Sequence, residues 1–215
     1  TVKDGESEVK LDFTMSYYGT GADVTGALGK LTFETADNTP LKKVKKVHDY
    51  IVSNSFITES EHSPTYLALK NTGSSHAYAM YTYMLLKKAN LDVRYVYGMK
   101  NGVYRSWNIV KIENNDWYNL DVAANDSTDR NNKDVNYRYF LTNNIGEHRI
   151  TVGAQETKDP SYDHLATADN KAVSDNFIYF VDADGKIKRI NNDTLKLDKD
   201  TIIDNIKMNN VEIKV

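Results

Sequence analysis

The chain has 215 residues and is 40% hydrophobic, with 15 Tyr and 6 Phe, which is enough for one ordinary domain with a real core and an appendage. Its formal net charge is −3 with both signs interspersed, so no basic block suggests nucleic acid as a partner, and no apolar run reaches the roughly 20 residues of a membrane span. Cysteine is absent, which excludes disulfides, cysteine-ligated metals and a thiol nucleophile from this chain.

The first part of the chain predicts one strand and two helices. Residues 9–18 alternate partly between apolar and polar side chains, as a strand does, and residues 24–34 predict a short helix. Thr39 and Pro40 form a helix start, with Thr39 as the N-cap and Pro40 at the first helical position. The apolar residues that follow fall on one face of this helix and lysines on the other, so it is expected to cover the core.

Two more helices are predicted before the pattern changes. Ser63 and Pro64 start a short helix that ends near Lys70. A longer helix is predicted over 75–89, and apolar residues occupy much of its circumference. We therefore expect this helix to be central and buried.

The pattern then changes to a period of two, which indicates strands. Strands are predicted at 93–98, 103–113, 117–122 and 137–142, with a polar loop at 124–136. The connections between the first three strands are short, so these strands are expected to be antiparallel neighbours. The expected sheet is antiparallel and has at least four strands.

The tail predicts a separate β unit. Residues 153–171 have no period and are expected to be a loop or linker, whereas 176–181 and 186–190 predict a hairpin. The Asp-Ala-Asp-Gly turn at 182–185 invites a calcium interpretation, but its glycine comes too early for an EF-hand loop and no glutamate follows at the required distance. A hairpin turn is therefore favoured. The predicted organisation is a leading strand and short helix over 1–36, a core over 37–155 and the β unit over 171–215.

Three positions in the middle of the chain have the layout of a thiol-dependent acyl-transfer site. A helix start carries a partial positive charge and free backbone N–H groups, and a cysteine there would be held as a thiolate. A histidine on an adjacent strand could exchange protons, and an aspartate on the next strand could orient it. This sequence fills the three positions with Ser75, Arg105 and Asp121.

The stretch around these positions, about residues 41–149, resembles the bacterial transglutaminase-like (papain-like) domains. The resemblance is carried, in family order, by the helix at 47–52, Gly-Ser-Ser-His-Ala-Tyr-Ala at 73–79, Arg-Ser-Trp-Asn at 105–108 where the family has His-Ala-Trp-Asn, Trp-Tyr-Asn-Leu-Asp at 117–121 and Tyr-Phe-Leu at 139–141. It implies an α+β, transglutaminase-like or papain-like fold, in which a central buried helix packs on an antiparallel sheet. The β unit predicted for the tail would be a C-terminal β appendage to this fold.

Two of the three family residues are replaced. By this resemblance Ser75 occupies the cysteine position and Arg105 the histidine position, and only Asp121 is retained. A hydroxyl is far less acidic than a thiol, and a guanidinium stays protonated at physiological pH and cannot act as a base. His76 lies about 100° from Ser75 around the helix. The resemblance therefore implies a degenerate triad in a pseudoenzyme retained for binding or scaffolding, without a cofactor.

Alternatives remain for what such a site does. We expect Arg105 to pair with Asp121, which either plugs the inactive site or leaves a cleft where Arg105 and the helix N-terminus bind a carboxylate or other anion. The candidate binding residues are Arg105, Trp107 and His76. The partner would be an unknown protein, peptide or cell-wall ligand. The alternative of a different class is an active acyl-transfer enzyme, a transglutaminase or peptidase, that uses Ser75 with an unconventional base.

The remaining signals favour structural roles. His48 lies on the apolar side of its helix and is interpreted as a core histidine with one hydrogen bond, and the other histidines lack metal-site spacing, so no metal is expected. The tyrosines and tryptophans near the sheet are expected mostly in the core, with an exposed subset that could stack on sugars. The missing cysteines, and a start at Thr1 from which we expect an upstream segment to have been removed, suggest an extracellular or cell-surface protein of a bacterium.

Overall fold

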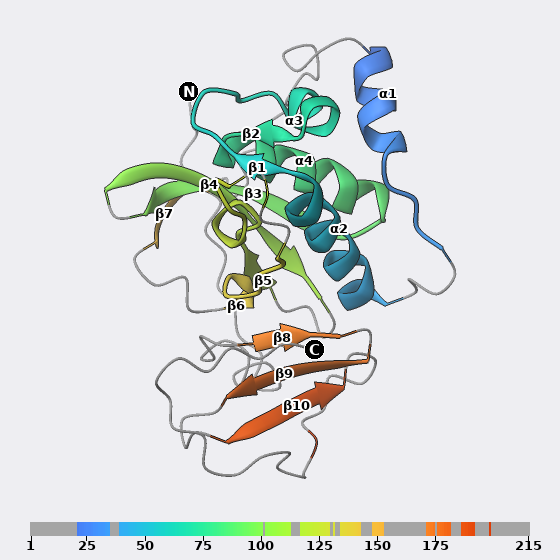
Figure 1. The fold of residues 1–215 in the computed structure, drawn as a ribbon, viewed down its shortest axis with the longest axis vertical. Helices are drawn as coiled ribbons and strands as arrows, with labels where there is room; N and C mark the ends of the chain where they lie inside the picture. Colours follow the sequence, from blue (N-terminus) through green and yellow to red (C-terminus); the bar gives the residue numbers. More distant parts are fainter. Residues whose placement is uncertain are drawn as a thin grey trace, which may run out of the picture.

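A computed structural model describes 21–34, 39–100, 102–112, 117–129, 131, 134–142, 148–152, 171–174, 176–181, 186–191 and 198. Within these residues, helices cover an antiparallel five-stranded sheet, and a three-stranded sheet lies beyond β5 and β6 (Figure 1). The strand predicted over 9–18, the linker up to residue 170 and the turn at 182–185 lie outside the described residues.

The two predicted helix starts with Pro are confirmed. In α2 (Pro40–Asn54), the Thr39 hydroxyl oxygen accepts a hydrogen bond from the backbone N–H of Lys42 at 3.3 Å. In α3 (Pro64–Lys70), the Ser63 hydroxyl accepts one from the Tyr66 N–H at 3.2 Å. A side-chain oxygen here satisfies one of the free donors of a first helical turn, and proline there loses no hydrogen bond.

The other two helices differ in how closely they follow the predicted ranges. Helix α1 (Gly21–Gly29) begins and ends earlier than the predicted 24–34, and Leu31 continues into the core after the helix has ended. Helix α4 (Ser75–Lys88) follows its prediction closely. It ends before Asn90, whose φ of 59° is in the left-handed region typical of helix ends.

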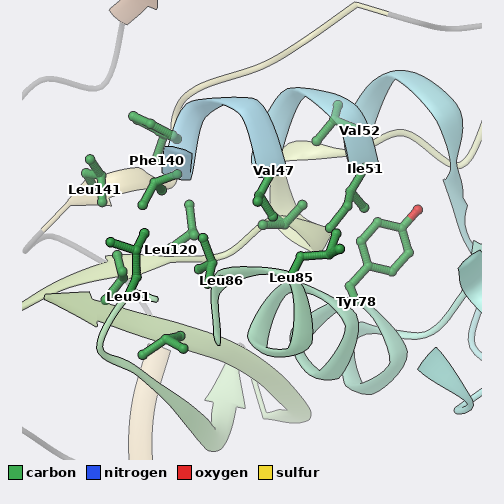
Figure 2. Close-up of a cluster of buried hydrophobic side chains, with 14 of the residues drawn as sticks. Val47, Ile51, Val52, Tyr78, Leu85, Leu86, Leu91, Leu120, Phe140 and Leu141 are labelled. Atoms are coloured by element: carbon green, nitrogen blue, oxygen red, sulfur yellow. The ribbon is translucent and has the colours of Figure 1, made fainter. Parts of the chain in front are cut away.

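The predicted burial of α4 is confirmed. Its buried residues occupy nearly all of its circumference: Ser75, Ala77, Tyr78, Ala79, Met80, Tyr81, Thr82, Met84, Leu85 and Leu86. Figure 2 shows Leu85 and Leu86 of α4 facing Val47 and Ile51 of α2 across the core. Because the sheet covers the opposite side of α4, this helix lies between two layers and exposes little surface.

The main sheet has the strand order β6-β5-β4-β3-β7, and all of its pairs are antiparallel. Its strands are β3 (Val93–Lys100), β4 (Val103–Lys111), β5 (Trp117–Leu120), β6 (Phe140–Thr142) and β7 (His148–Val152). Lys100 pairs with Val103, so β3 and β4 are joined by a two-residue turn in which Gly102 has a φ of +78°. Strand β7 was not predicted, because it is short and pairs with the distant β3.

The C-terminal sheet has the order β10-β9-β8, with β8 (Lys171–Val173), β9 (Phe177–Val181) and β10 (Ile187–Asn191). The predicted hairpin of β9 and β10 is confirmed, and β8 is an additional strand. Val173, Ile178, Phe180 and Ile190 belong to the same buried cluster as the helices and the main sheet. The C-terminal sheet therefore contributes one face to the common core.

Candidate functional site

The start of α4 is held by the segment that precedes α3. Strand β1 (Phe56–Ile57) pairs in parallel with β2 (Thr72–Gly73), which leads directly into α4. The backbone N–H of Thr58 donates to the Gly73 carbonyl at 2.9 Å, and the Ser74 N–H donates to the Glu61 carbonyl at 2.6 Å. A Cβ at Gly73 would lie 2.8 Å from the Ala77 Cβ, so only glycine fits this approach.

Ser75 is the first residue of α4 and is buried. Its hydroxyl oxygen accepts a hydrogen bond from the backbone N–H of Ser106 on β4, at a long 3.4 Å. Within the part of the chain that the structure describes, no imidazole or carboxylate is hydrogen-bonded to this hydroxyl. The fold therefore brings the helix start against the strand that carries Arg105, but among the described residues it places no base beside Ser75.

The expected ion pair between Arg105 and Asp121 is wrong. The Arg105 Nη2 lies 3.2 Å from the Oε1 of Glu59, and the two side chains are 27% and 71% exposed. Asp121 is buried and accepts a hydrogen bond at 2.9 Å from the backbone N–H of Ala124, which lies in the short 3-10 turn Ala123–Asn125. The pairing differs because the segment after β1 brings the Glu59 carboxylate over β4. The Asp121 carboxylate instead faces the turn that follows it in the chain.

Trp107, a predicted binding residue, lies on the same strand as Arg105 but is only 1% exposed. Its indole N–H donates to the Asn119 side-chain oxygen at 3.1 Å, and its ring packs in a small cluster with Val96 and Ile109. Asn108 follows it and donates to the carbonyl of Ala79, which fixes β4 to α4. The Trp107 ring therefore has no surface left for a ligand.

His76, the other predicted binding residue, bonds to a tyrosine and not to Ser75. Its Nδ1 lies 2.8 Å from the Tyr95 hydroxyl, which in turn lies 2.5 Å from the Ser106 hydroxyl. Burial lowers the pKa of His76 below its ordinary value, and the positive charge of nearby His62 lowers it further. His76 is therefore held as a neutral imidazole beside the site.

The structure also shows a serine–histidine contact that the sequence analysis missed. The His62 Nδ1 lies 2.7 Å from the hydroxyl of Ser74, the N-cap of α4, whose side chain makes no capping bond. The two residues are 12 positions apart in sequence, and no motif joins them. His62 is exposed and its ring lies 6.3 Å from that of His76.

His48 is a core histidine, as expected, although it makes two hydrogen bonds. The Asn125 side-chain oxygen accepts from the Tyr139 N–H at 2.8 Å, so its amide donates to the His48 Nε2 at 3.0 Å. The proton of His48 is thus on Nδ1, which donates to Asp49 at 2.9 Å. Burial raises the pKa of Asp49, but the bond from His48 and the charge of Lys45 outweigh it, and the net pKa is lowered.

A second buried contact fixes the loop after Asp121. The Tyr78 hydroxyl of α4 donates to the Asp126 carboxylate at 2.5 Å, and burial, followed by the charge of Asp126, raises the pKa of Tyr78 far above its ordinary value. Asn125 and Asp126 thus connect this loop to α2 and α4. These contacts hold the loop that follows Asp121 in the chain.

The described side chains contain no group of three or more His, Asp or Glu placed to hold a metal ion. Among the described helices, none has the length and hydropathy of a membrane-crossing segment.

The sequence matches the model of the transglutaminase-like superfamily over residues 30–122. No curated protein matches the chain. A solved structure from Cytophaga hutchinsonii, described as a candidate cysteine protease, is 18% identical with a TM-score of 0.34; the similarity covers 46% of this chain and only 35%, about a third, of that protein. The expected α+β fold, with a central buried helix packed on an antiparallel sheet, is confirmed. Residues 30–122 of this chain thus form a transglutaminase-like domain.

Proposed function

We propose that this chain is a catalytically inactive transglutaminase-like protein that acts as a binding or scaffolding module at a bacterial cell surface. The observation that carries the proposal is the environment of the Ser75 hydroxyl. Its hydrogen-bond partner is a backbone N–H, which donates to the oxygen and cannot accept its proton. A serine nucleophile needs a base within hydrogen-bond reach, and none lies there among the described residues.

The residue at the histidine position supports the same proposal. Arg105 remains a cation at physiological pH, and its charge is already compensated by Glu59. A guanidinium neither takes a proton from a nucleophile nor returns one to a leaving group. When nucleophile and base are both lost, a site of this kind loses most of its rate enhancement.

The Arg105–Glu59 pair favours a plugged site over an anion-binding cleft. An external carboxylate at Arg105 would have to displace a carboxylate of the same chain. An ion pair this exposed contributes only about 0–1 kcal/mol, so the pair is better described as charge compensation than as a strong bond. A ligand of the module is therefore expected to use a different part of the surface.

The inactivity is tested by incubating the chain with an amine donor and a glutamine-rich protein, and separately with peptidoglycan peptides. The expected result is no product from the parent chain, from Ser75→Ala or from Ser74→Ala, with an active transglutaminase as positive control. Turnover lost in Ser75→Ala would overturn the proposal. Turnover lost in Ser74→Ala alone would also overturn it and would assign the chemistry to the hydroxyl bonded to His62.

The cell-surface location is tested by protease treatment of intact bacteria that express the full-length protein. Cleavage within this chain while a cytosolic marker stays intact supports the location, and protection until lysis contradicts it.

A further inference from the structure

A row of aromatic side chains extends from the start of α4 along the β3–β4 hairpin. We call His76, Tyr95, Tyr97 and Tyr104 the aromatic row. The His76 and Tyr95 rings lie 5.5 Å apart, and the Tyr97 and Tyr104 rings stack at 5.3 Å with an angle of 11°. Tyr95 and Tyr97 are two residues apart on β3 and therefore lie on the same face of the sheet.

The strand register explains how the far end of the row forms. Tyr97 pairs with Ser106, so Tyr104 is its diagonal neighbour on the adjacent strand and the two rings can meet. Tyr97 covers one face of the Tyr104 ring, yet the Tyr104 residue is 62% exposed. The other face of this ring is therefore open to solvent.

Exposed hydrophobic residues are rare elsewhere in the described chain. The large ones are Tyr66 at 38%, Leu69 at 45%, Val103 at 54% and Tyr104 at 62%, and the two most exposed are neighbours at this hairpin. A cross-strand aromatic pair at an exposed site adds only about 0.2–1 kcal/mol to a hairpin. Exposed apolar clusters on soluble proteins commonly mark interaction sites.

The row presents rings and neutral polar groups without formal charge. No hydrogen bond of the Tyr97 or Tyr104 hydroxyl is found among the described residues, and the exposed Tyr104 can offer its hydroxyl to a ligand. His76 is a neutral imidazole at neutral pH, because burial lowers its pKa. The adjacent charge of Arg105 is compensated by Glu59. An anionic or cationic ligand would find no opposite charge in the row.

We propose that the aromatic row binds a neutral polysaccharide. The apolar C–H face of a sugar ring stacks on the open face of Tyr104, and the sugar hydroxyls hydrogen-bond to the tyrosine hydroxyls along the row. At about 150–250 Å² each, three tyrosines together offer at most about 750 Å² of contact area. This is less than the roughly 800 Å² that each partner buries in a stable protein interface. The size and neutrality of the row thus favour a sugar chain over a protein, and the inference rests on the proposed binding function.

The test is affinity electrophoresis of the whole chain in gels containing hydroxyethyl cellulose or glycol chitin. We expect retardation of the parent chain in at least one gel, and a dissociation constant raised up to about tenfold in Tyr104→Thr, which removes the ring but keeps a residue suited to strands. Tyr104→Phe is expected to retain most of the binding. Tyr66→Thr, an exposed tyrosine on α3 outside the row, is the matched control and is expected to bind like the parent.

A melting temperature of Tyr104→Thr within about 4 °C of the parent, which is the most that loss of the cross-strand pair should cost, shows that the hairpin is still folded. No retardation in either gel, or equal retardation of the parent chain and Tyr104→Thr, would overturn the inference. Binding instead to immobilised casein peptides, lost in Tyr104→Thr, would overturn it in favour of a peptide. Because turnover is measured separately, a chain that is retarded yet forms product contradicts only the proposed inactivity.

Discussion

Replacing Gly73 by alanine tests the close packing at the start of α4. The added Cβ would lie 2.8 Å from the Ala77 Cβ, 3.4 Å from the Leu67 Cβ and 3.5 Å from the Glu61 carbonyl oxygen. The first distance is shorter than non-bonded carbon atoms tolerate. Neither Ala77 nor Leu67 can turn its Cβ away, because both Cβ positions are fixed by helical backbone.

We expect Gly73→Ala to lower the free energy of unfolding by about 1–3 kcal/mol, the usual cost of an extra carbon in a packed core. For a chain of this size each kcal/mol lowers the melting temperature by about 2–4 °C, so the expected decrease is roughly 2–12 °C. Urea unfolding measures the free energy of unfolding, and calorimetry independently measures the melting temperature.

Two further variants make the reasoning falsifiable. Gly26 lies in α1, and a Cβ added there would meet nothing within 4 Å, so Gly26→Ala is expected to stabilise the chain by about 0.5–1 kcal/mol through helix propensity. Ala77→Gly removes the closest atom, so its cost should be smaller in the Gly73→Ala background than in the parent chain. A melting temperature of Gly73→Ala equal to that of the parent, or strictly additive costs in the double variant, would refute the steric argument.

Three other predictions follow from buried polar contacts. Tyr78 keeps its proton in the folded chain because burial and a nearby carboxylate raise its pKa, so its contribution to stability is present below the ordinary pKa of 10.0 and falls as the pH rises above it. Between pH 8 and pH 11 the free energy of unfolding, measured with denaturant, should therefore fall less steeply for Tyr78→Phe than for the parent, and parallel curves would contradict this. Because the pKa of His76 is lowered in the folded chain, the unfolded chain binds the proton more readily, so the stability from this group is present above pH 6.5 and is lost as the pH falls. In His76→Gln the melting temperature should therefore decrease less between pH 7 and pH 5 than in the parent. Asn125→Ala leaves the His48 Nε2 and the Tyr139 N–H without their buried partner and should cost about 2–4 kcal/mol in urea unfolding, and a cost below 1 kcal/mol would show that other groups replace it.

The candidate site could be located from the sequence because its parts are marked by local patterns. Gly73 and the serines after it mark a helix start, and period-two stretches place Arg105 and Asp121 on successive strands. Which groups meet there could not be predicted. The partner of Arg105 is Glu59, from a loop whose position depends on the β1–β2 pair, and nothing in the sequence near Glu59 indicates that contact.

The sequence by itself determined the starts of α2, α3 and α4, the buried character of α4, and the β3–β4 and β9–β10 hairpins. Capping bonds join residues only three apart, and hydrophobic periodicity is a property of the segment alone. Only the tertiary structure decided that β7 completes the sheet beside β3, that Trp107 is enclosed and that Tyr97 and Tyr104 form an exposed pair. These features depend on distances between segments remote in sequence, and such distances exist only once the chain has folded.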